Sequence, residues 1–186
     1  MKIIGIKNEK GIEMPRQQVY LMADSSVIKT NKPFFIPHFA SSFLASSAIV
    51  LHIDRLGKHI ASRFAHRYCH SIAPAVKLTA TGTEGALGQS FDGALLLGDN
   101  IPVDCDLDIN QASVEAQVGE HMLPSLSLSD MGIDYRTVIS ELSVYFTLKM
   151  GDMIVVELAD CSNPLQQGWT INALLNGRQQ LTVRVK

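Results

Sequence analysis

The chain has 186 residues, 46% of them hydrophobic and 18% charged, and its formal net charge is −2. This length and composition predict one globular domain, residues 1–186, with a sizeable core. The near-neutral charge and the lack of a dense Lys/Arg run speak against a nucleic-acid partner. No apolar segment approaches the roughly 18 residues of a membrane span. Three separated cysteines without a CxxC pair, Cys69, Cys105 and Cys161, indicate reduced thiols and hence a cytoplasmic protein.

The first third of the chain predicts short strands joined by polar connections. MKIIGI is typical of an opening strand, and residues 19–28 of a strand that runs into a turn. Two prolines within residues 31–39 favour an extended edge or a loop. Residues 44–53 predict a further strand, because their second half alternates between two faces. The face opposite its isoleucines and leucine carries only small or weakly reactive side chains.

The middle of the chain predicts a helix followed by strands. Apolar residues recur at four-residue spacing from Ile60, which predicts a helix over 60–72, and Pro74 is expected to end it. Residues 75–81 alternate and predict a strand. A Gly-rich loop follows, and residues 90–102 hold a short apolar strand between turns.

The last part of the chain predicts two hairpins and a second helix. Residues 104–118 alternate strongly and predict a hairpin around Asn110-Gln111. Residues 135–146 predict a helix, and residues 150–158 a strand entered through Gly151-Asp152. Asn176-Gly177 is the strongest hairpin signal in the chain. Together these elements predict an α+β domain dominated by strands.

Motif searches by spacing alone identify no chemistry. His66 and His70 are four apart on the predicted helix, a spacing that can place two imidazoles on one metal. No HExxH pattern surrounds them and a third ligand is not evident, so structural histidines are the preferred interpretation. TGTEG lacks the ending of a phosphate-binding loop. No GxSxG frame surrounds the serines that lie near predicted turns and strands, Ser46, Ser47 and Ser90.

Five longer segments occur in an order and spacing that match a known family. They are KPFFIPHF, IDRLGKHIASRFAHRY, QSFDGALLLGD, YFTLKMGDMI and LLNGRQQLTVRVK, and together they span about residues 19–186. In these segments the chain resembles the fumarylacetoacetate hydrolase (FAH) family. The resemblance implies a mixed β-sandwich roll like the FAH C-terminal domain, usually assembled as a homodimer. It also implies enzymes that cleave, isomerise or decarboxylate small oxo acids with Mg²⁺ or Mn²⁺.

The family's metal ligands are the point at which this sequence departs from the pattern. In the family, the strand after KPFF carries Glu-x-Glu, and period-two geometry places both carboxylates on one face, where they bind the metal. The corresponding positions here are Ser46 and Ala48. The third ligand is an aspartate on the strand after FAHRY, and its position here is Lys77. The resemblance therefore implies no metal ligands and no bound cofactor.

Other functional positions of the family are also changed. The lysine that usually precedes FDG by two residues is Gln89, although Asp92 of the FDG motif is retained. The family's TGTP loop is replaced by VELA, residues 156–159. The N-terminal lid, which normally supplies a His/Glu pair as general base, corresponds to a shortened region, 1–18, without a histidine. We therefore expect no residue with a catalytic role, and a vestigial cleft formed by Ser46, Ala48, Lys77, Gln89 and Asp92.

These changes favour a degenerate, metal-free family member. It is expected to bind a small carboxylic acid or to support an active relative, without catalysis. The alternatives are an enzyme that acts on small oxo acids in the old cleft without metal, and a structural homodimer whose cleft is filled by side chains. Lys77 makes the cleft more positive and can attract a carboxylate ligand if its ammonium turns inward. Otherwise Lys77 extends to solvent along its apolar stem.

Overall fold

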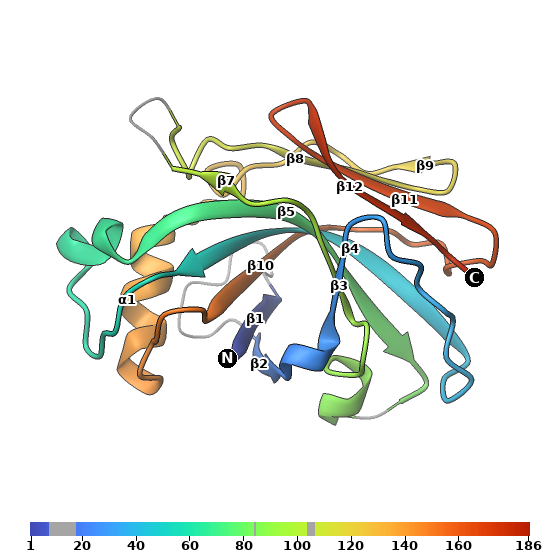
Figure 1. Ribbon diagram of the computed structural model, residues 1–186, viewed down its shortest axis with the longest axis horizontal. Coiled ribbons are helices and arrows are strands. Elements are labelled where there is room, and N and C mark those ends of the chain that lie inside the picture. Colours follow the sequence, from blue (N-terminus) through green and yellow to red (C-terminus); the bar gives the residue numbers. More distant parts are fainter. Residues whose placement is uncertain (8–17, 84, 104–106) are drawn as a thin grey trace.

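The computed structural model describes residues 1–7, 18–83, 85–103 and 107–186. A curled mixed sheet of eight strands packs against a second, antiparallel sheet of four strands (Figure 1). The strand-dominated α+β prediction is confirmed. The large sheet contains β1 (Ile3–Lys7), β2 (Gln18–Met22), β3 (Val27–Lys29), β4 (Ser42–Ile53), β5 (Cys69–Thr81), β6 (Leu95–Leu97), β7 (Ile101–Pro102) and β10 (Met153–Asp160). The smaller sheet contains β8 (Val114–Val118), β9 (His121–Met122), β11 (Thr170–Leu175) and β12 (Arg178–Arg184).

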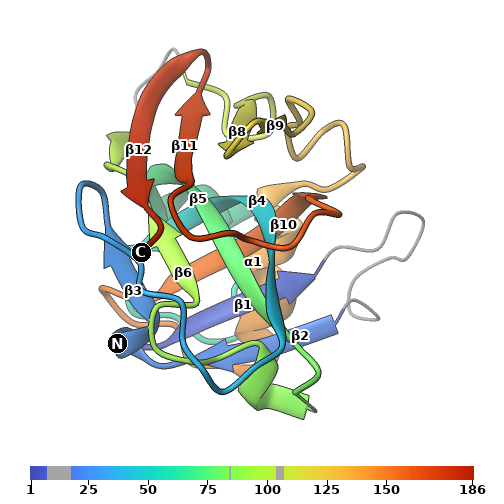
Figure 2. The same ribbon diagram turned by 90° about the vertical axis from the view of Figure 1, so that its right-hand side faces the viewer.

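The large sheet is ordered β2-β1-β10-β4-β5-β6-β3, with β7 paired to β5. Strand β1 runs parallel to β10 and β3 parallel to β6, while the other pairs are antiparallel. The long strands β4 and β5 cross the molecule beneath β11 and β12 (Figure 1), and the sheet curls so that β1 and β2 lie below them (Figure 2). This curl brings the N-terminal strands close to the centre of β5.

Strand β4 is buried on both faces through its middle, from Ala45 to Leu51. One face of the large sheet packs on the smaller sheet and on α1 (Tyr135–Tyr145), and the other encloses a separate apolar cluster inside the curl. A strand covered on both faces carries few charged side chains, in agreement with the uncharged run Ser46-Ser47-Ala48 in its centre. Functional groups near this strand must therefore come from its neighbours.

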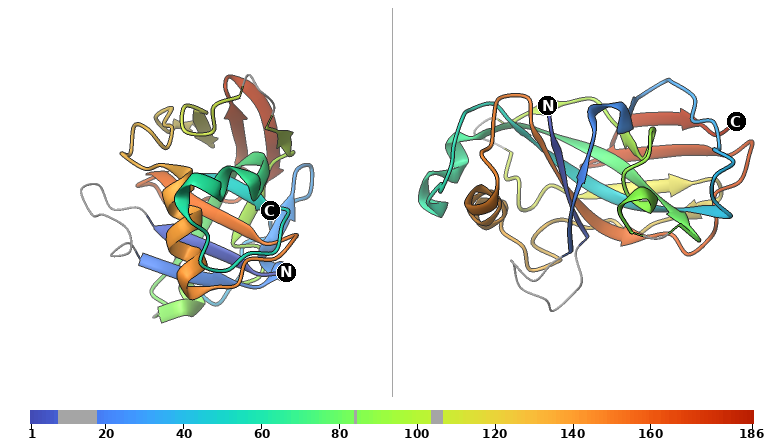
Figure 3. Two further views of the ribbon diagram at one scale, coloured as in Figure 1. Left: turned by 90° about the vertical axis from the view of Figure 1, so that its left-hand side faces the viewer. Right: turned by 90° about the horizontal axis from the view of Figure 1, so that it is seen from below.

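The helix predicted over 60–72 does not form. A short 3₁₀ helix, η2 (Ser62–Arg67), occupies the first part, and β5 begins at Cys69, which pairs with Ile53. Two further 3₁₀ turns are η1 (Asp24–Ser26) and η3 (Gly85–Gly88). Ile60 and Ala65 reach the core while Phe64 is 38% exposed, and pairing of the later residues with β4 outweighs the helical spacing. Helix α1 packs beside η2 at one end of the molecule (Figure 3).

Pro74 lies inside β5 and does not end a helix. Its carbonyl accepts a hydrogen bond from the Gly98 amide at 2.9 Å, so its side without an N–H faces the β6/β7 edge. There it falls between the pairing of β7 with Ser71 and Ile72 and the pairing of β6, which begins at Ala75. A proline is tolerated at this point because no ladder hydrogen bond requires its missing donor.

The hairpin predicted over 104–118 is only half present. Residues 104–106, with Cys105, lie outside the described residues, and residues 107–109 form no strand beside β8. Asn110 instead accepts a hydrogen bond from the Tyr135 amide, and Asp134 accepts one from Arg136 to cap α1. The turn at Asn110 therefore hydrogen-bonds to the N-terminus of α1 instead of closing a hairpin. The helix expected over 135–146 and the hairpin around Asn176-Gly177 are confirmed.

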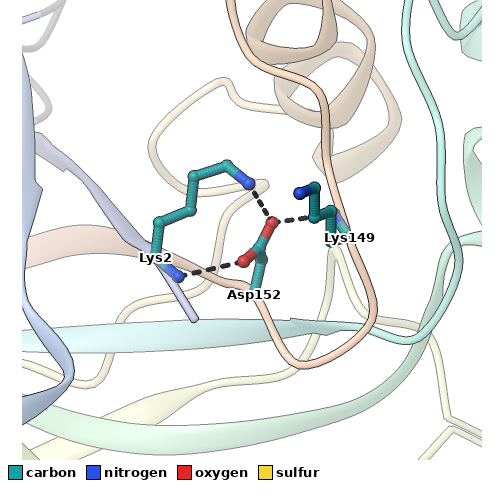
Figure 4. A network of polar contacts seen from close by, with 3 residues as sticks. All are labelled: Lys2, Lys149 and Asp152. Atoms are coloured by element: carbon teal, nitrogen blue, oxygen red, sulfur yellow. Dashed lines mark hydrogen bonds and ion pairs between the residues drawn. The ribbon is translucent and has the colours of Figure 1, made fainter.

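The predicted entry into β10 through Gly151-Asp152 is also confirmed. Gly151 has a φ of +87°, a left-handed conformation that favours glycine. Asp152 accepts hydrogen bonds from the Lys2 and Lys149 amides, at 3.0 and 2.7 Å, and pairs with the Lys2 ammonium (Figure 4). This buried carboxylate joins the start of β1 to the turn before β10. No helix of the described residues is long and apolar enough to cross a membrane.

Candidate functional site

The three positions expected to replace the metal ligands lie together on two neighbouring strands. Ser46 stands opposite Lys77 in the β4–β5 register, and Ala48 stands two residues further along β4 opposite Ala75. Ala48 and Ala75 belong to the apolar cluster inside the curl of the large sheet. Because side chains alternate along a strand, Ser46 and Lys77 point to that same side. We call this region the Lys77 cleft and define it by Ser46, Lys77 and the groups that contact them.

Lys77 is fully buried, with 0% of its surface exposed. Its Nζ donates hydrogen bonds to the Leu78 carbonyl at 2.6 Å and to Gln89 Oε1 at 3.4 Å, and lies 5.2 Å from the centre of the Tyr20 ring. The structure thus places Gln89 beside Lys77, and both were expected to lie in one cleft. The alternative in which Lys77 extends to solvent is wrong.

The strongest polar contact of the cleft comes from residues that the sequence analysis did not select. Tyr20 on β2 donates a 2.6 Å hydrogen bond to Glu157 Oε1 on β10. Glu157 is 3% exposed, and its Oε2 is buried without a hydrogen-bond partner. Residues 156–159, which the resemblance predicts to replace a family loop, lie within β10, where Glu157 stands opposite Ala48. An isolated glutamate in the apolar run IVVELA was the available signal.

A second carboxylate reaches the cleft from the end of β10. Ser46 Oγ donates a 2.7 Å hydrogen bond to Asp160 Oδ1. The register of β10 shifts between Glu157 and Ala159, so Glu157 stands opposite Ala48 and Asp160 opposite Ser46. This bulge places both acids of β10 on the side of the missing family carboxylates.

Burial and nearby charges set the protonation of the cleft. Burial lowers the pKa of Lys77 from 10.5 to about 8, with the Lys7 charge acting in the same direction and the Glu157 charge opposing both. Burial also raises the pKa of Tyr20 far above its usual range, and the charge of Glu157 and the hydrogen bond to it act in the same sense. Tyr20 therefore remains a phenol that donates to Glu157, while Lys77 loses its proton more readily than an ordinary lysine.

Asp92 does not join this group, although it belongs to the retained FDG motif. It is exposed, and its Oδ1 accepts a 2.6 Å hydrogen bond from Ser25. Phe91 beside it packs edge-on against Phe39 and Phe43, and Gly93 adopts a φ of +86°. The FDG segment of this chain is therefore held by aromatic packing and a left-handed turn rather than by contact with Lys77.

The donors present do not suit Mg²⁺ or Mn²⁺. Among the described residues, no three His, Cys, Asp or Glu side chains lie close enough to hold a metal ion. Ser46 provides only a neutral hydroxyl, Ala48 provides nothing, and the two acids of β10 each use an oxygen for a protein hydrogen bond. Hard divalent ions need several charged oxygens, and a cation such as Lys77 nearby opposes them.

An open pocket of about 770 Å³ lies next to the cleft. It is lined by β2, including Tyr20, by Thr79 near the end of β5, and by Gln89 after η3. Gln89 Oε1 accepts hydrogen bonds from Thr79 at 3.3 Å and from Lys77 at 3.4 Å. Lys77 therefore lies directly behind the Gln89–Thr79 wall of the pocket.

The protein is thus of a class built on a curled mixed sheet, and its candidate site, the Lys77 cleft, lies inside the curl. The family model described as fumarylacetoacetate (FAA) hydrolase C-terminal matches residues 6–182. The chain therefore belongs to the fumarylacetoacetate hydrolase family. The sequence matches none of the curated proteins.

Solved structures with the same fold include several members and relatives of this family. A fumarylacetoacetate hydrolase family protein from Yersinia pestis CO92 has a TM-score of 0.87 and 19% identity, covering 100% of this chain and 92% of that one. The fumarylpyruvate hydrolase from Pseudomonas aeruginosa, in complex with Mn²⁺ and pyruvate, has a TM-score of 0.87 and 15% identity, covering 100% and 89%. The 5-carboxymethyl-2-hydroxymuconate delta-isomerase from Mycobacterium smegmatis has a TM-score of 0.85 and 18% identity, covering 99% and 78%.

Proposed function

We propose that this protein binds a small oxo acid or related carboxylic acid in the pocket beside Lys77 without a divalent metal. In this role it is a non-catalytic member of the family, a pseudoenzyme that senses or carries an acid or supports an active relative. The observation that carries the proposal is the Lys77 amine, buried directly behind the pocket wall where the family pattern has an aspartate ligand. A positive group at this place can attract a carboxylate directly.

The ligand class follows from two considerations. The fumarylpyruvate hydrolase of the same fold was solved with Mn²⁺ and pyruvate. A chain that keeps this fold but replaces the metal ligands by Ser46, Ala48 and Lys77 needs another positive group for such an anion. Lys77 supplies that charge, and Gln89 and Thr79 supply polar contacts at the pocket wall.

Thermal denaturation in the presence of pyruvate, oxaloacetate or succinate tests the proposal. A ligand that binds only the folded chain raises the melting temperature in proportion to the logarithm of its concentration. We expect at least one of these acids to do so without added metal, and the shift to disappear in Lys77→Met. Lys29→Met, which removes an exposed lysine of β3, serves as the matched control. A shift that is unchanged in Lys77→Met would contradict the proposal.

The Tyr20–Glu157 pair favours a second candidate, a metal-independent hydrolase or decarboxylase of small oxo acids. A buried carboxylate with one free oxygen and a phenol beside it are groups that can move protons. Assays of oxaloacetate decarboxylation and acylpyruvate hydrolysis, with and without Mn²⁺, separate it from the non-catalytic proposal. Turnover without metal that is lost in Glu157→Gln would support the second candidate.

A further inference from the structure

Lys77 and Glu157 are buried inside the curled sheet, and the half-buried Lys7 lies at the end of β1 beside them, an arrangement that the metal-free binding site does not by itself require. Lys7 ends β1 and is close enough for its charge to lower the pKa of Lys77. Glu157 is close enough to act in the opposite direction. A second cation beside a buried lysine is one of the arrangements that activate an amine as a nucleophile.

The backbone of β1 is shaped to hold the phenol next to these groups. Gly5 pairs with Tyr20 across the β1–β2 ladder, and a Cβ at Gly5 would lie 2.1 Å from the Tyr20 ring. The ring therefore lies across the strand in space that any other residue would fill. This position lets Tyr20 reach Glu157 and also places its ring 5.2 Å from Lys77 Nζ.

Two residues that line the pocket, Gln89 and Tyr20, lie next to the buried Lys77 amine. Gln89, which lines the pocket, meets Nζ at 3.4 Å, at the long end of the hydrogen-bond range. Gln89 also accepts a hydrogen bond from Thr79 at 3.3 Å, and access to Nζ from the pocket requires the Gln89 side chain to move. The tighter bond to the Leu78 carbonyl, at 2.6 Å, comes from the strand itself and holds the amine in place.

We propose that Lys77 forms a reversible imine with the oxo group of a small oxo acid bound in this pocket. The inference rests on the proposed function and adds covalent capture to it. The Nζ lone pair attacks the carbonyl carbon, a C–N bond forms, and the carbonyl electron pair moves to oxygen. The nitrogen then loses protons and the oxygen leaves as water, so that amine and carbonyl give imine and water with no oxidant or reductant.

The surrounding residues provide what this condensation requires. The free Oε2 of Glu157 can accept the proton that leaves the nitrogen, and the Tyr20 hydroxyl on the other oxygen keeps the carboxylate oriented. The charge of Lys7, which acts on Lys77, favours the approach of an anion while the amine of Lys77 is neutral. Since its pKa is about 8, about a tenth of Lys77 is the reactive free base at pH 7 and about half at pH 8.

Reductive trapping tests the inference on the full chain. The protein is incubated with pyruvate and sodium cyanoborohydride, and the adduct is located by mass spectrometry of peptides. We expect one reduced pyruvyl group per chain, at Lys77, with the yield rising as the pH increases through about 8. Succinate, which lacks an oxo group, is expected to protect the protein thermally but to leave no adduct.

Variants separate covalent capture from binding. Lys77→Arg keeps a cation but cannot form an imine, so we expect acid binding without adduct, whereas Lys29→Met is expected to label like the wild type. Gln89→Ala should increase the labelling rate, and Lys7→Met should shift the pH profile of labelling upward. Circular dichroism is used to check that each variant is folded. The position of the adduct in the wild-type protein is read directly from its peptide map and does not depend on any variant.

The possible failures are distinguishable. Pyruvate binding by thermal shift with no adduct at Lys77 overturns the imine and leaves the proposed function intact. Labelling spread over exposed lysines, with Lys77 unmodified, likewise overturns it. No thermal shift with any of the three acids, and no adduct, overturns the proposed function and the imine together.

Discussion

At the scale of single residues, our proposal keeps a positive charge beside the pocket, although a different residue carries it than in the family pattern. The family pattern has an aspartate at the position of Lys77 and a lysine at the position of Gln89. In this chain the side chains at these two positions meet, with Nζ 3.4 Å from Oε1. The cation therefore remains next to the pocket although it comes from β5 instead of the segment after η3. Glu157, from β10, supplies the negative charge that faces it.

Titration with Mn²⁺ is expected to give no saturable site at millimolar metal. Ser46 is a weak neutral ligand, and a unit positive charge about 4 Å from a divalent cation costs roughly 8 kcal/mol at an effective dielectric near 20. Among the described residues of the cleft, Glu157 and Asp160 are the acids that could compensate, but two carboxylates without phosphate rarely hold such an ion. Isothermal titration calorimetry checks this. A 1:1 site that disappears in Glu157→Gln would contradict the metal-free proposal.

Lys77 also predicts a specific dependence of stability on pH. Burial lowers its folded pKa from 10.5 to about 8, so between these values the unfolded chain binds a proton that the folded chain does not. Stability from this group therefore rises as the pH increases from about 8 to 10.5. Relative to Lys77→Met, the wild type should gain up to about 3 kcal/mol over this window. Urea denaturation at several pH values measures the difference, and a constant difference would count against a depressed pKa.

At the scale of elements, the site depends on how β1 meets its neighbours. Strand β1 lies between β2 and β10, so it sets the distance between Tyr20 and Glu157. It is short, and two features secure it: the glycine under the Tyr20 ring and the contacts of Lys2 with Asp152. Changes in β1 should therefore act on the cleft without touching Lys77.

Gly5→Ala is expected to displace the Tyr20 ring and to destabilise the protein by about 1–3 kcal/mol, the usual cost of overpacking. The physical reason is the 2.1 Å approach of an added Cβ to the ring. A double-mutant cycle with Tyr20→Ala checks the cause by chemical denaturation. The two changes together should cost less than their sum, because removing the ring makes room for the methyl group. Simple additivity would show that the ring is not the obstacle.

Asp152→Asn should weaken the junction of β1 and β10 by about 2 kcal/mol, since a buried carboxylate that accepts charged and amide donors is lost. Burial acts to raise the pKa of Asp152, but the hydrogen bonds and charge of Lys2 and the Lys149 amide lower it overall. The stabilisation is therefore present above the unfolded value of 3.8 and is lost as the pH falls through the lower folded value.

Thermal denaturation at neutral and acidic pH measures this effect. Asp99→Asn, at an exposed loop aspartate, is the matched control and should change the melting temperature little. The difference between Asp152→Asn and the wild type should shrink at the lowest pH. An equal loss in both variants would contradict the specific role of Asp152.

At the scale of the whole molecule, the large sheet leaves apolar side chains exposed near its β2 edge. Val19 and Leu21 on β2 and Leu87 in η3 are exposed by 37%, 49% and 72%. Such residues on an edge strand are a recurrent basis for association. Family resemblance adds the expectation that the chain forms a homodimer.

Light scattering at micromolar concentration is expected to give twice the chain mass of 20.4 kDa. Leu21→Lys, which places a charge on the exposed face of β2, should shift the population toward monomer if this edge takes part. The same substitution should leave the far-ultraviolet circular dichroism unchanged. A wild-type mass near that of one chain at these concentrations would rule out the homodimer.

The sequence by itself determined the family and the strand-rich class, and it led to the expectation that Ser46, Ala48 and Lys77 replace the family's carboxylates. It also located local elements with local causes, such as the Asn176-Gly177 turn and α1, because their signals lie within a few residues. Only the tertiary structure decided that β5 replaces a predicted helix and that Glu157 and Tyr20 meet beside Lys77. The reason is that Tyr20 and Glu157 are 137 positions apart and meet only because β1 brings β2 and β10 together in the sheet. No local sequence pattern encodes such a contact.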